Sequence, residues 1–218
     1  MPLLLTSSNQ CPRTPQAGCT LHQKKPINRV ILFLIGIELL LASTFALAGP
    51  FIAVFITQGI KGGTLTIVGI TTTIFLITKS ILQIFFSRAI DRISDEKSVA
   101  AIMSVGYAIV GLSPFILAFS TGVWSVFISS LVCGVGGALL YPTWNQLFTL
   151  HIDKEQAAFE WSMYDTAVGI SGALAATLGG VLIDKVGFQY VFMAVGLLMM
   201  ASSFLPGFLY GRVRDVHT

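Results

Sequence analysis

The chain has 218 residues, of which 54% are hydrophobic and 11% charged, and its net charge is +3. A soluble domain carries about 25% charged residues, so this composition excludes a water-soluble globular domain. It indicates an integral membrane protein whose partner is the lipid bilayer, and we expect no nucleic-acid partner.

The N-terminal segment, residues 1–28, is polar and rich in proline. Such a composition cannot bury a core and predicts a flexible cytoplasmic tail. Cys11 and Cys19 lie in this tail without His or Cys partners at zinc spacing, so we expect no metal there. Residues 29–211 are predicted to form the transmembrane domain, and residues 212–218 a short second cytoplasmic tail.

Six apolar segments follow the tail, each of roughly 20 residues or more, which is enough to cross a bilayer core about 30 Å thick. Backbone inside the bilayer must satisfy its own hydrogen bonds, and these segments are too long for barrel strands, so all six are predicted to be helices. They are Arg29–Thr57, Thr64–Phe86, Val99–Phe119, Val123–Leu147, Phe159–Ile183 and Tyr190–Tyr210. The fold class is therefore an all-α membrane bundle.

The first segment contains Gly49-Pro50, which predicts a kink near its outer end. The orientation follows from the distribution of Lys and Arg. Ten of the thirteen fall on the side of the N-terminal tail and two on the other side, while Lys79 lies within a span. The positive-inside rule then places both termini in the cytoplasm of a cell whose plasma or inner membrane holds the protein.

The densest charge in the chain lies between the second and third spans, in Ser87–Lys97. A short charged link between two spans predicts a tight turn at the membrane surface. Within it, Ile90-Asp91-Arg92-Ile93 is echoed 93 positions later by Ile183-Asp184-Lys185-Val186. This echo favours a repeat of spans one to three in spans four to six, which an odd number of spans would invert.

This link resembles a signature of the major facilitator superfamily, Gly-x-x-x-Asp-Arg-x-Gly-Arg-Arg/Lys, found between the second and third spans. Asp91 and Arg92 fill its acidic and basic positions, Ser87 and Ser94 replace its glycines, and Asp95-Glu96 replace its basic pair. The resemblance implies that Asp91 and Arg92 belong to a cytoplasmic gate.

Two further stretches carry the same resemblance. Gly134-Val135-Gly136-Gly137-Ala138 is similar to the glycine-rich fourth span, although Ser130 stands where the family has an arginine associated with proton coupling. The run from Gly169 to Phe192 is similar to the fifth and sixth spans. The family normally has twelve spans, so the resemblance implies one half of a transporter, of the N-terminal lobe type, with a 3+3 inverted repeat.

Two charges lie inside the predicted spans at similar depth. Glu38 is about 13 Å beyond Arg29, and Lys79 is about 12 Å from Ser87, at 1.5 Å per residue. A charge at mid-bilayer costs at least about 2.5–3.5 kcal/mol, so each needs a partner or a pathway. We predict that the two pair with each other, either to fix the packing or to contact a solute or ion.

A second polar group is predicted toward the cytoplasmic mouth, where Asp165 of the fifth span meets Asn145 and Gln146 at the end of the fourth. These residues either solvate the mouth or line the pathway. Three aromatic residues nearby are interpreted as interfacial anchors or as cavity-lining side chains, with the anchor role favoured for the two tryptophans. They are Tyr141, Trp144 and Trp161.

We predict no enzymatic activity and no cofactor. Gly169-Ile170-Ser171-Gly172 matches the Gly-x-Ser-Gly of rhomboid-type intramembrane proteases, but His22, His151 and His217 all lie outside the spans, where none can serve as the general base. No phosphate-binding or dinucleotide-binding motif is present.

The sequence thus favours transport of a small solute by alternating access. Half a transporter cannot enclose a path alone, so we expect a homodimer or a second six-helix half. The alternative is a membrane scaffold without transport activity, or a fragment of a twelve-helix transporter. Glu38, Lys79, Asp165, Asn145, Gln146 and Tyr141 are the predicted pathway residues.

Overall fold

The computed structural model describes residues 28–207, and these are helical throughout apart from short links. The predicted tails lie outside the described residues, except for Asn28, which caps the first helix. The elements are α1 (Arg29–Ala48), η1 (Gly49–Phe51), α2 (Ile52–Gly59), α3 (Leu65–Ile90), α4 (Glu96–Ala118), α5 (Val123–His151), α6 (Ala157–Val186) and α7 (Phe188–Ser202). Six helical stretches in this part of the chain are long and apolar enough to span a membrane, so the predicted fold class is confirmed.

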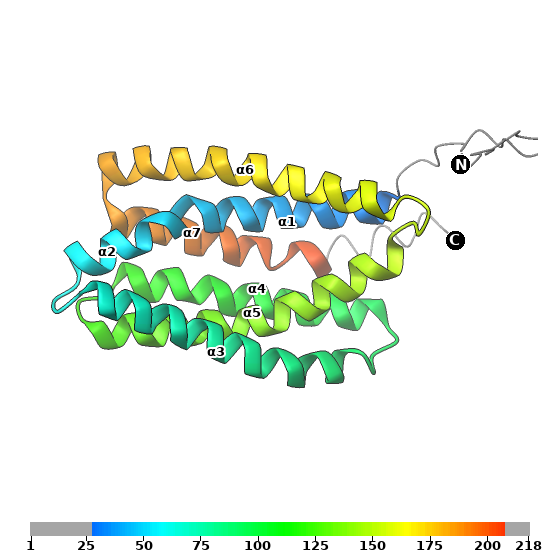
Figure 1. Ribbon diagram of the computed structural model, residues 1–218, viewed down its shortest axis with the longest axis horizontal. Helices are drawn as coiled ribbons and strands as arrows, with labels where there is room; N and C mark the ends of the chain where they lie inside the picture. The colour runs from blue at the N-terminus through cyan, green and yellow to red at the C-terminus, as the bar shows by residue number, and fades with distance from the viewer. Residues whose placement is uncertain (1–27, 208–218) are drawn as a thin grey trace, which may run out of the picture.

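The first span is interrupted where the sequence predicts a kink. The 3₁₀ turn η1 begins at Gly49 and includes Pro50, which has no N–H to continue the α-helical hydrogen bonds. Figure 1 shows α2 leaving the axis of α1 at this turn. At the other end, the Asn28 side chain accepts a hydrogen bond from the N–H of Val30 at 3.0 Å, which satisfies one orphan donor of α1.

The links between spans alternate between the two ends of the bundle, as Figure 1 shows. The α3–α4 and α5–α6 links lie at the end where α1 begins, and the α2–α3 and α4–α5 links lie at the opposite end. At that opposite end, Lys61 and Gly122 form a backbone bridge that holds the two links side by side. The links alternate because each span runs in the direction opposite to the span before it.

The charged link between α3 and α4 is built from two helix ends. α3 continues to Ile90, four residues beyond the predicted end, and the N–H of Asp91 donates to the carbonyl of Ser87 at 2.8 Å. Asp95 is the N-cap of α4, and its carboxylate accepts hydrogen bonds from the N–H groups of Lys97 and Ser98. The acidic residue that departs from the family signature therefore starts the next span.

One side of the bundle is closely packed. α4 lies against both α5 and α7, and the buried core is drawn mainly from α1, α4, α5 and α7. A Cβ on Gly136 of α5 would lie 2.6 Å from the side chain of Val110, so glycine is what allows α5 to approach α4. Nearby, the buried hydroxyls of Ser113 and Ser129 form a hydrogen bond of 2.8 Å between the same two helices. We call the outer surface of α4 and α7 the closed face.

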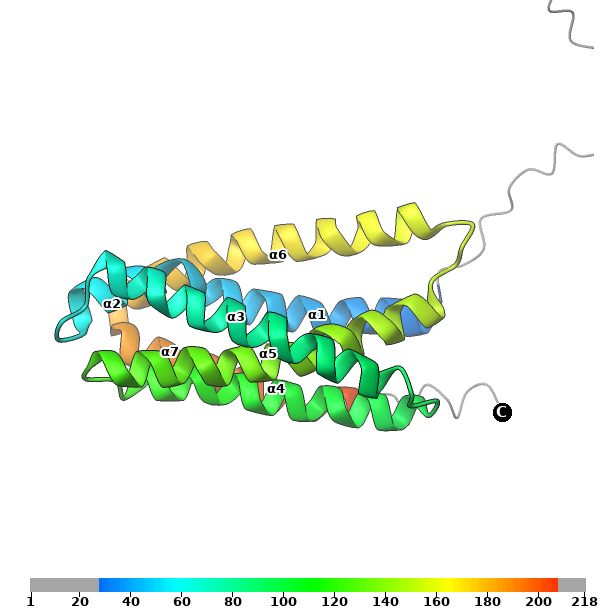
Figure 2. The same ribbon diagram turned by 60° about the horizontal axis from the view of Figure 1, so that its bottom comes forward.

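The other side is open. α3 packs chiefly on α5, and α6 chiefly on α1, so neither helix is enclosed by neighbours. Figure 2 shows α6 at the edge of the bundle, lying along α1 and away from α4. In an apolar stretch of 18 residues from each span, 6% of the residues are buried in α3 and 17% in α6, against 50% in α4. We call the exposed surface of α3 and α6 the open face.

Candidate functional site

A cavity of about 320 Å³ lies within the span region, between the two helices of the open face. Five helices contribute to its walls, so it is a property of the whole bundle and not of one segment. Its lining residues combine two charges with many aromatic and apolar side chains. They are Glu38, Leu41, Phe45, Phe75, Lys79, Tyr107, Val110, Cys133, Gly137, Leu140, Tyr141, Trp144, Asn145, Trp161 and Tyr164.

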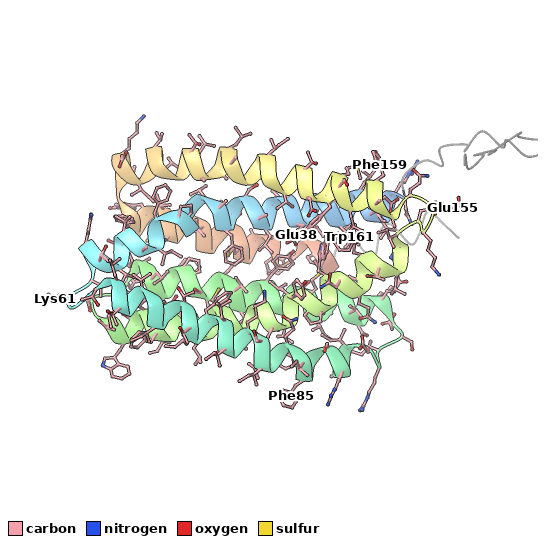
Figure 3. All side chains as sticks on the ribbon, viewed as in Figure 1. Glu38, Lys61, Phe85, Glu155, Phe159 and Trp161 are labelled. Carbon is pink, nitrogen blue, oxygen red and sulfur yellow. The ribbon has the colours of Figure 1, made fainter. Side chains whose placement is uncertain are left out.

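Glu38 supplies the negative charge of the cavity, from the middle of α1. Its side chain is half-buried, and Figure 3 shows it next to Trp161 of α6. The hydroxyls of Tyr107 and Tyr164 lie close enough to interact electrostatically with its carboxylate. Tyr107 is buried, and the Glu38 carboxylate lies within hydrogen-bonding reach of its hydroxyl. The carboxylate thus faces the cavity among aromatic side chains.

Lys79 supplies the positive charge, from α3. Its ammonium lies 4.9 Å from the ring centroid of Tyr141, which is a cation–π contact. Among the described residues, no ion pair joins Lys79 to Glu38, so the direct pairing that we predicted is not formed. The two residues instead share one cavity, each as a separate charge.

An aromatic cluster closes the cavity toward the end where α1 begins, and it joins α5 to α6. The ring of Trp144 stacks on Phe148 at a centroid distance of 4.8 Å and lies 4.7 Å from Tyr164. Trp161 lies 4.7 Å from Phe148 and 6.0 Å from Trp144. Trp144 is only 6% exposed. The structure therefore favours the cavity-lining role over the interfacial-anchor role for Trp144, while Trp161 lines the cavity and is 37% exposed.

A second hollow, of about 450 Å³, lies nearer the α3–α4 link. Asp91 of the signature, Gln146, Tyr141 and Asn145 line it, and the last two also line the central cavity. The Gln146 side-chain amide approaches the carbonyl of Ile93 at 3.5 Å. Tyr141 and Asn145 therefore border both hollows, whereas Gln146 borders only the second.

Asp165 does not join this group. It lies eight residues into α6, about 12 Å along the axis, is exposed and lines neither hollow. It follows Trp161 by four residues, so it continues the same stripe of α6 one turn deeper. The structure thus separates Asp165 from Asn145 and Gln146 and places it on the open face.

The two gate residues, Asp91 and Arg92, are exposed at the end of α3. In residues 28–207 the Asp91 carboxylate makes no hydrogen bond or ion pair, although it borders the second hollow. Asp95 is different, because hydrogen bonds from the Ser98 hydroxyl and from two backbone N–H groups lower the pKa of its carboxyl below the ordinary value. The carboxylate of Asp95 thus accepts hydrogen bonds within the turn, whereas that of Asp91 can still accept hydrogen bonds from another group.

Sequence reasoning missed the contribution of four aromatic residues to the cavity wall, namely Phe45, Phe75, Tyr107 and Tyr164. A signal was present for one of them. Tyr164 follows Trp161 by three residues, and Phe148 follows Trp144 by four, so each pair shares a helix face. No comparable signal marks Tyr107, which lies alone in an apolar stretch. The described residues hold no group of three or more His, Cys, Asp or Glu side chains suited to a metal ion.

Comparison with known proteins gives relatives that are all transporters. The probable hexose phosphate transport protein of Chlamydia trachomatis serovar D is 28% identical over 125 residues, which are 56% of this chain and 26% of that protein. The proton-coupled antiporter flippase LtaA of Staphylococcus saprophyticus is 24% identical over 125 residues, which are 56% of this chain and 31% of LtaA. The aligned region thus spans less than a third of either relative.

The fold itself matches a solved structure, that of the POT family transporter PepTSo. The TM-score is 0.69 at 16% sequence identity, and the match covers 86% of this chain and 38% of that one. The model of the Major Facilitator Superfamily matches residues 32–217, which is nearly the whole chain. Together with the six-helix bundle, this match shows that the chain belongs to the Major Facilitator Superfamily.

Proposed function

We propose that this chain is one lobe of a transporter that moves a small solute by alternating access, together with a second six-helix half. Family membership favours transport over catalysis. The single observation that carries the proposal is a cavity with two charges in the span region, whose wall includes α3 and α6, the two least buried spans. A cavity bounded by one lobe needs a second lobe to complete its wall.

The open face supports the second half through its polar side chains. Asp165 is exposed there about 12 Å inside the span, and a charge at such depth costs at least about 2.5 kcal/mol if it faces lipid. Exposed hydroxyl residues along the two helices add to this, whereas the exposed polar residues of α4 and α7 lie in the first turns of those helices, at Lys97, Ser98 and Gln189. On α3 and α6 the exposed hydroxyl residues are Thr66, Thr72, Thr73, Ser80, Ser162, Thr166 and Thr177.

The packing pairs support the predicted 3+3 inverted repeat. α3 packs on α5 while α6 packs on α1, and α4 packs on α5 while α7 packs on α1. Exchanging the first three spans for the last three leaves this set of contacts unchanged. Such an exchange is what two copies of a three-helix unit in opposite orientation would give.

We further propose that Asp91 and Arg92 act at the cytoplasmic gate, with both termini in the cytoplasm of a plasma or inner membrane. Asp91 borders the second hollow and keeps a free carboxylate, which can accept hydrogen bonds from a helix N-terminus of the second half. Tyr141 and Asn145 border both this hollow and the cavity, which supports a route between the gate and the cavity.

The second half can be tested by cross-linking in native membranes. A single cysteine on the open face, Thr177→Cys, is introduced after Cys11, Cys19 and Cys133 have been replaced. We expect a cross-linked product either of twice the chain's mass, which indicates a homodimer, or of the chain plus a partner half. The matched control is Leu198→Cys, which lies on the closed face and should give no such product. A strictly monomeric chain in both variants would favour the scaffold.

Alternating access can be tested without knowing the solute, because Cys133 itself lines the cavity. With Cys11 and Cys19 replaced by serine, Cys133 is the single thiol of the chain. We expect a membrane-impermeant thiosulfonate to label it from either side of oriented vesicles, in separate experiments. Labelling from one side only would contradict alternating access and favour the scaffold alternative.

A further inference from the structure

The two charges of the cavity have no counter-charge within the described part of the chain. The carboxylate of Glu38 faces tyrosine hydroxyls, and the ammonium of Lys79 faces the ring of Tyr141. Neither residue takes part in an ion pair there, although both line the same cavity. A charge inside a span is costly, and a partner of opposite sign offsets this cost best. A group that brings both signs would supply both missing counter-charges.

One buried polar atom in the same wall also lacks a partner. The indole N–H of Trp144, which is 6% exposed, makes no hydrogen bond. A buried donor without a partner is unfavourable, and in native proteins it is usually explained by a ligand or a water molecule. Trp144 lines the cavity together with Glu38 and Lys79. The wall therefore offers an unused hydrogen-bond donor to a solute.

The size of the cavity limits what it can hold. Its volume of about 320 Å³ corresponds to roughly ten water molecules at about 30 Å³ each. This space suits a solute of the size of an amino acid or a dipeptide. The rings of Trp144, Trp161 and Tyr164 provide aromatic faces beside Glu38, and such faces attract an ammonium group.

We propose that the cavity binds a small zwitterionic solute, whose ammonium group contacts Glu38 and whose acidic group contacts Lys79. This inference rests on the proposed transport function and adds the chemical class of the solute. The aromatic faces beside Glu38 contribute to binding the ammonium group, and the indole N–H of Trp144 is available to the acidic group. Both charges of the wall are then neutralised by one ligand.

Solutes of a single charge fit this wall less well. A cation neutralises Glu38 but meets the positive charge of Lys79 in the same small volume, and an anion such as a sugar phosphate meets Glu38 in the same way. A neutral solute leaves both charges without a counter-charge. Each of these alternatives retains at least one uncompensated charge inside the membrane, which the zwitterion does not.

The test is a binding measurement on the full chain in lipid nanodiscs, read by tryptophan fluorescence. Trp124 is 80% exposed and lies outside the cavity, so Trp124→Phe leaves only the two cavity tryptophans as reporters. The probes are L-leucine and L-alanyl-L-leucine, the amide of each as a cation, the N-acetyl form of each as an anion, and glucose 6-phosphate. We expect at least one zwitterion to bind about tenfold or more tightly than its blocked forms.

Two variants assign the charges. Glu38→Gln should reduce the affinity for the zwitterion to that for its N-acetyl form, and Lys79→Met should reduce it to that for its amide. Lys79→Arg, which keeps the charge, should retain the preference and shows that the fold tolerates a change at this position. Asp184→Asn and Lys185→Met remove one charge each at exposed positions outside the cavity and should leave all affinities unchanged.

The inference is overturned if neither zwitterion binds more tightly than its blocked forms, or if glucose 6-phosphate binds most tightly. It is equally overturned if the Glu38→Gln protein still prefers the zwitterion over its blocked forms, provided that both Glu38→Gln and Lys79→Arg fold. These outcomes leave the transport proposal intact, because the two-sided labelling of Cys133 does not depend on the solute. Conversely, one-sided labelling with zwitterion binding retained would reject transport while leaving the ligand class in place.

Discussion

The closed face and the open face of this bundle are made from helices of similar hydropathy, yet they differ in what they expose. Within the spans, the exposed side chains of α4 and α7 are apolar, among them Val105, Leu112 and Leu197. The exposed side chains of α3 and α6 include several hydroxyls and Asp165. The second face also exposes large apolar residues, among them Ile77 and Leu174. In the proposed transporter, lipid covers the first face, and the second half or a solute path covers the polar part of the second.

The packing behind the two faces differs in the same sense. On the closed side, glycines allow helix backbones to approach closely, as at Gly136 and Val110. On the open side, α5 and α6 are held together mainly by the aromatic cluster at one end. The open side is therefore held by fewer contacts between these two helices than the closed side is between α4 and α5. Four predictions test this comparison.

The largest expected effect is at Phe148, which is fully buried in the aromatic cluster. Phe148→Ala should lower the free energy of unfolding by about 3–5 kcal/mol, the range for deleting a buried phenylalanine. It should also release the first turns of α6, seen as faster hydrogen exchange there. Phe85→Ala, at a residue that is 64% exposed on α3, is the control and should change the stability by less than about 0.5 kcal/mol. Equal effects of the two changes would contradict the role of the cluster.

The next effect compares a charge on each face at equal depth. Val105 is nine residues into α4 and 53% exposed on the closed face, and Asp165 is eight residues into α6 on the open face. Val105→Asp should reduce membrane insertion by about 2.5–3.5 kcal/mol, because the carboxylate would face lipid.

The matched change on the open face is Asp165→Leu, which should leave insertion and folding unchanged and weaken association with the second half. Insertion is measured by glycosylation mapping, and association by the Thr177→Cys cross-link. If Val105→Asp inserts as well as the unchanged protein, the assignment of the closed face to lipid is wrong.

A smaller effect is expected from added volume on the closed side. Gly136→Leu should lower the free energy of unfolding by about 1–3 kcal/mol, since its Cβ alone would lie 2.6 Å from Val110 and α5 must move away from α4. A Cβ added at Gly169 on α6 would meet no atom within 4 Å, so Gly169→Leu should fold normally. Thermal unfolding in detergent measures the loss of stability in Gly136→Leu. Cross-linking to the second half shows whether Gly169→Leu disturbs the open face.

The smallest effect concerns the cap of α4, where the pKa of Asp95 is lowered by hydrogen bonds from the Ser98 hydroxyl and from backbone N–H groups. A carboxyl whose pKa is lower in the folded state stabilises the fold above its unfolded value, and this stabilisation is lost as the pH falls through the folded value. Asp95→Ala should therefore lower the Tm slightly at neutral pH, and the difference should disappear in acid.

Asp95→Asn is the control for this titration, because asparagine can cap the helix without ionising. At neutral pH its Tm should equal that of the unchanged protein. In acid its Tm should not show the decrease that protonation of Asp95 causes in the unchanged protein. A difference between Asp95→Ala and the unchanged protein that persists in acid would show that the cap does not act through its charge.

The sequence alone was sufficient for the six spans, the kink at Gly49-Pro50 and the family. These features are local, because the bilayer imposes length and hydropathy on each span separately and proline removes its own hydrogen bond. It also predicted that Glu38 and Lys79 lie at similar depth, and both line the cavity. Depth along a helix follows from residue number, so the sequence contains it.

The direction in which each side chain points was decided only by the tertiary structure. Each span is apolar around most of its circumference, so periodicity does not show which face is buried, and the rotation of the helix depends on its neighbours. For this reason the predicted pairing of Glu38 with Lys79 gave way to two separate charges around a cavity, and Trp144 moved from anchor to cavity wall. Asp165 was separated from Asn145 for the same reason, because it lies on a helix that packs chiefly on α1.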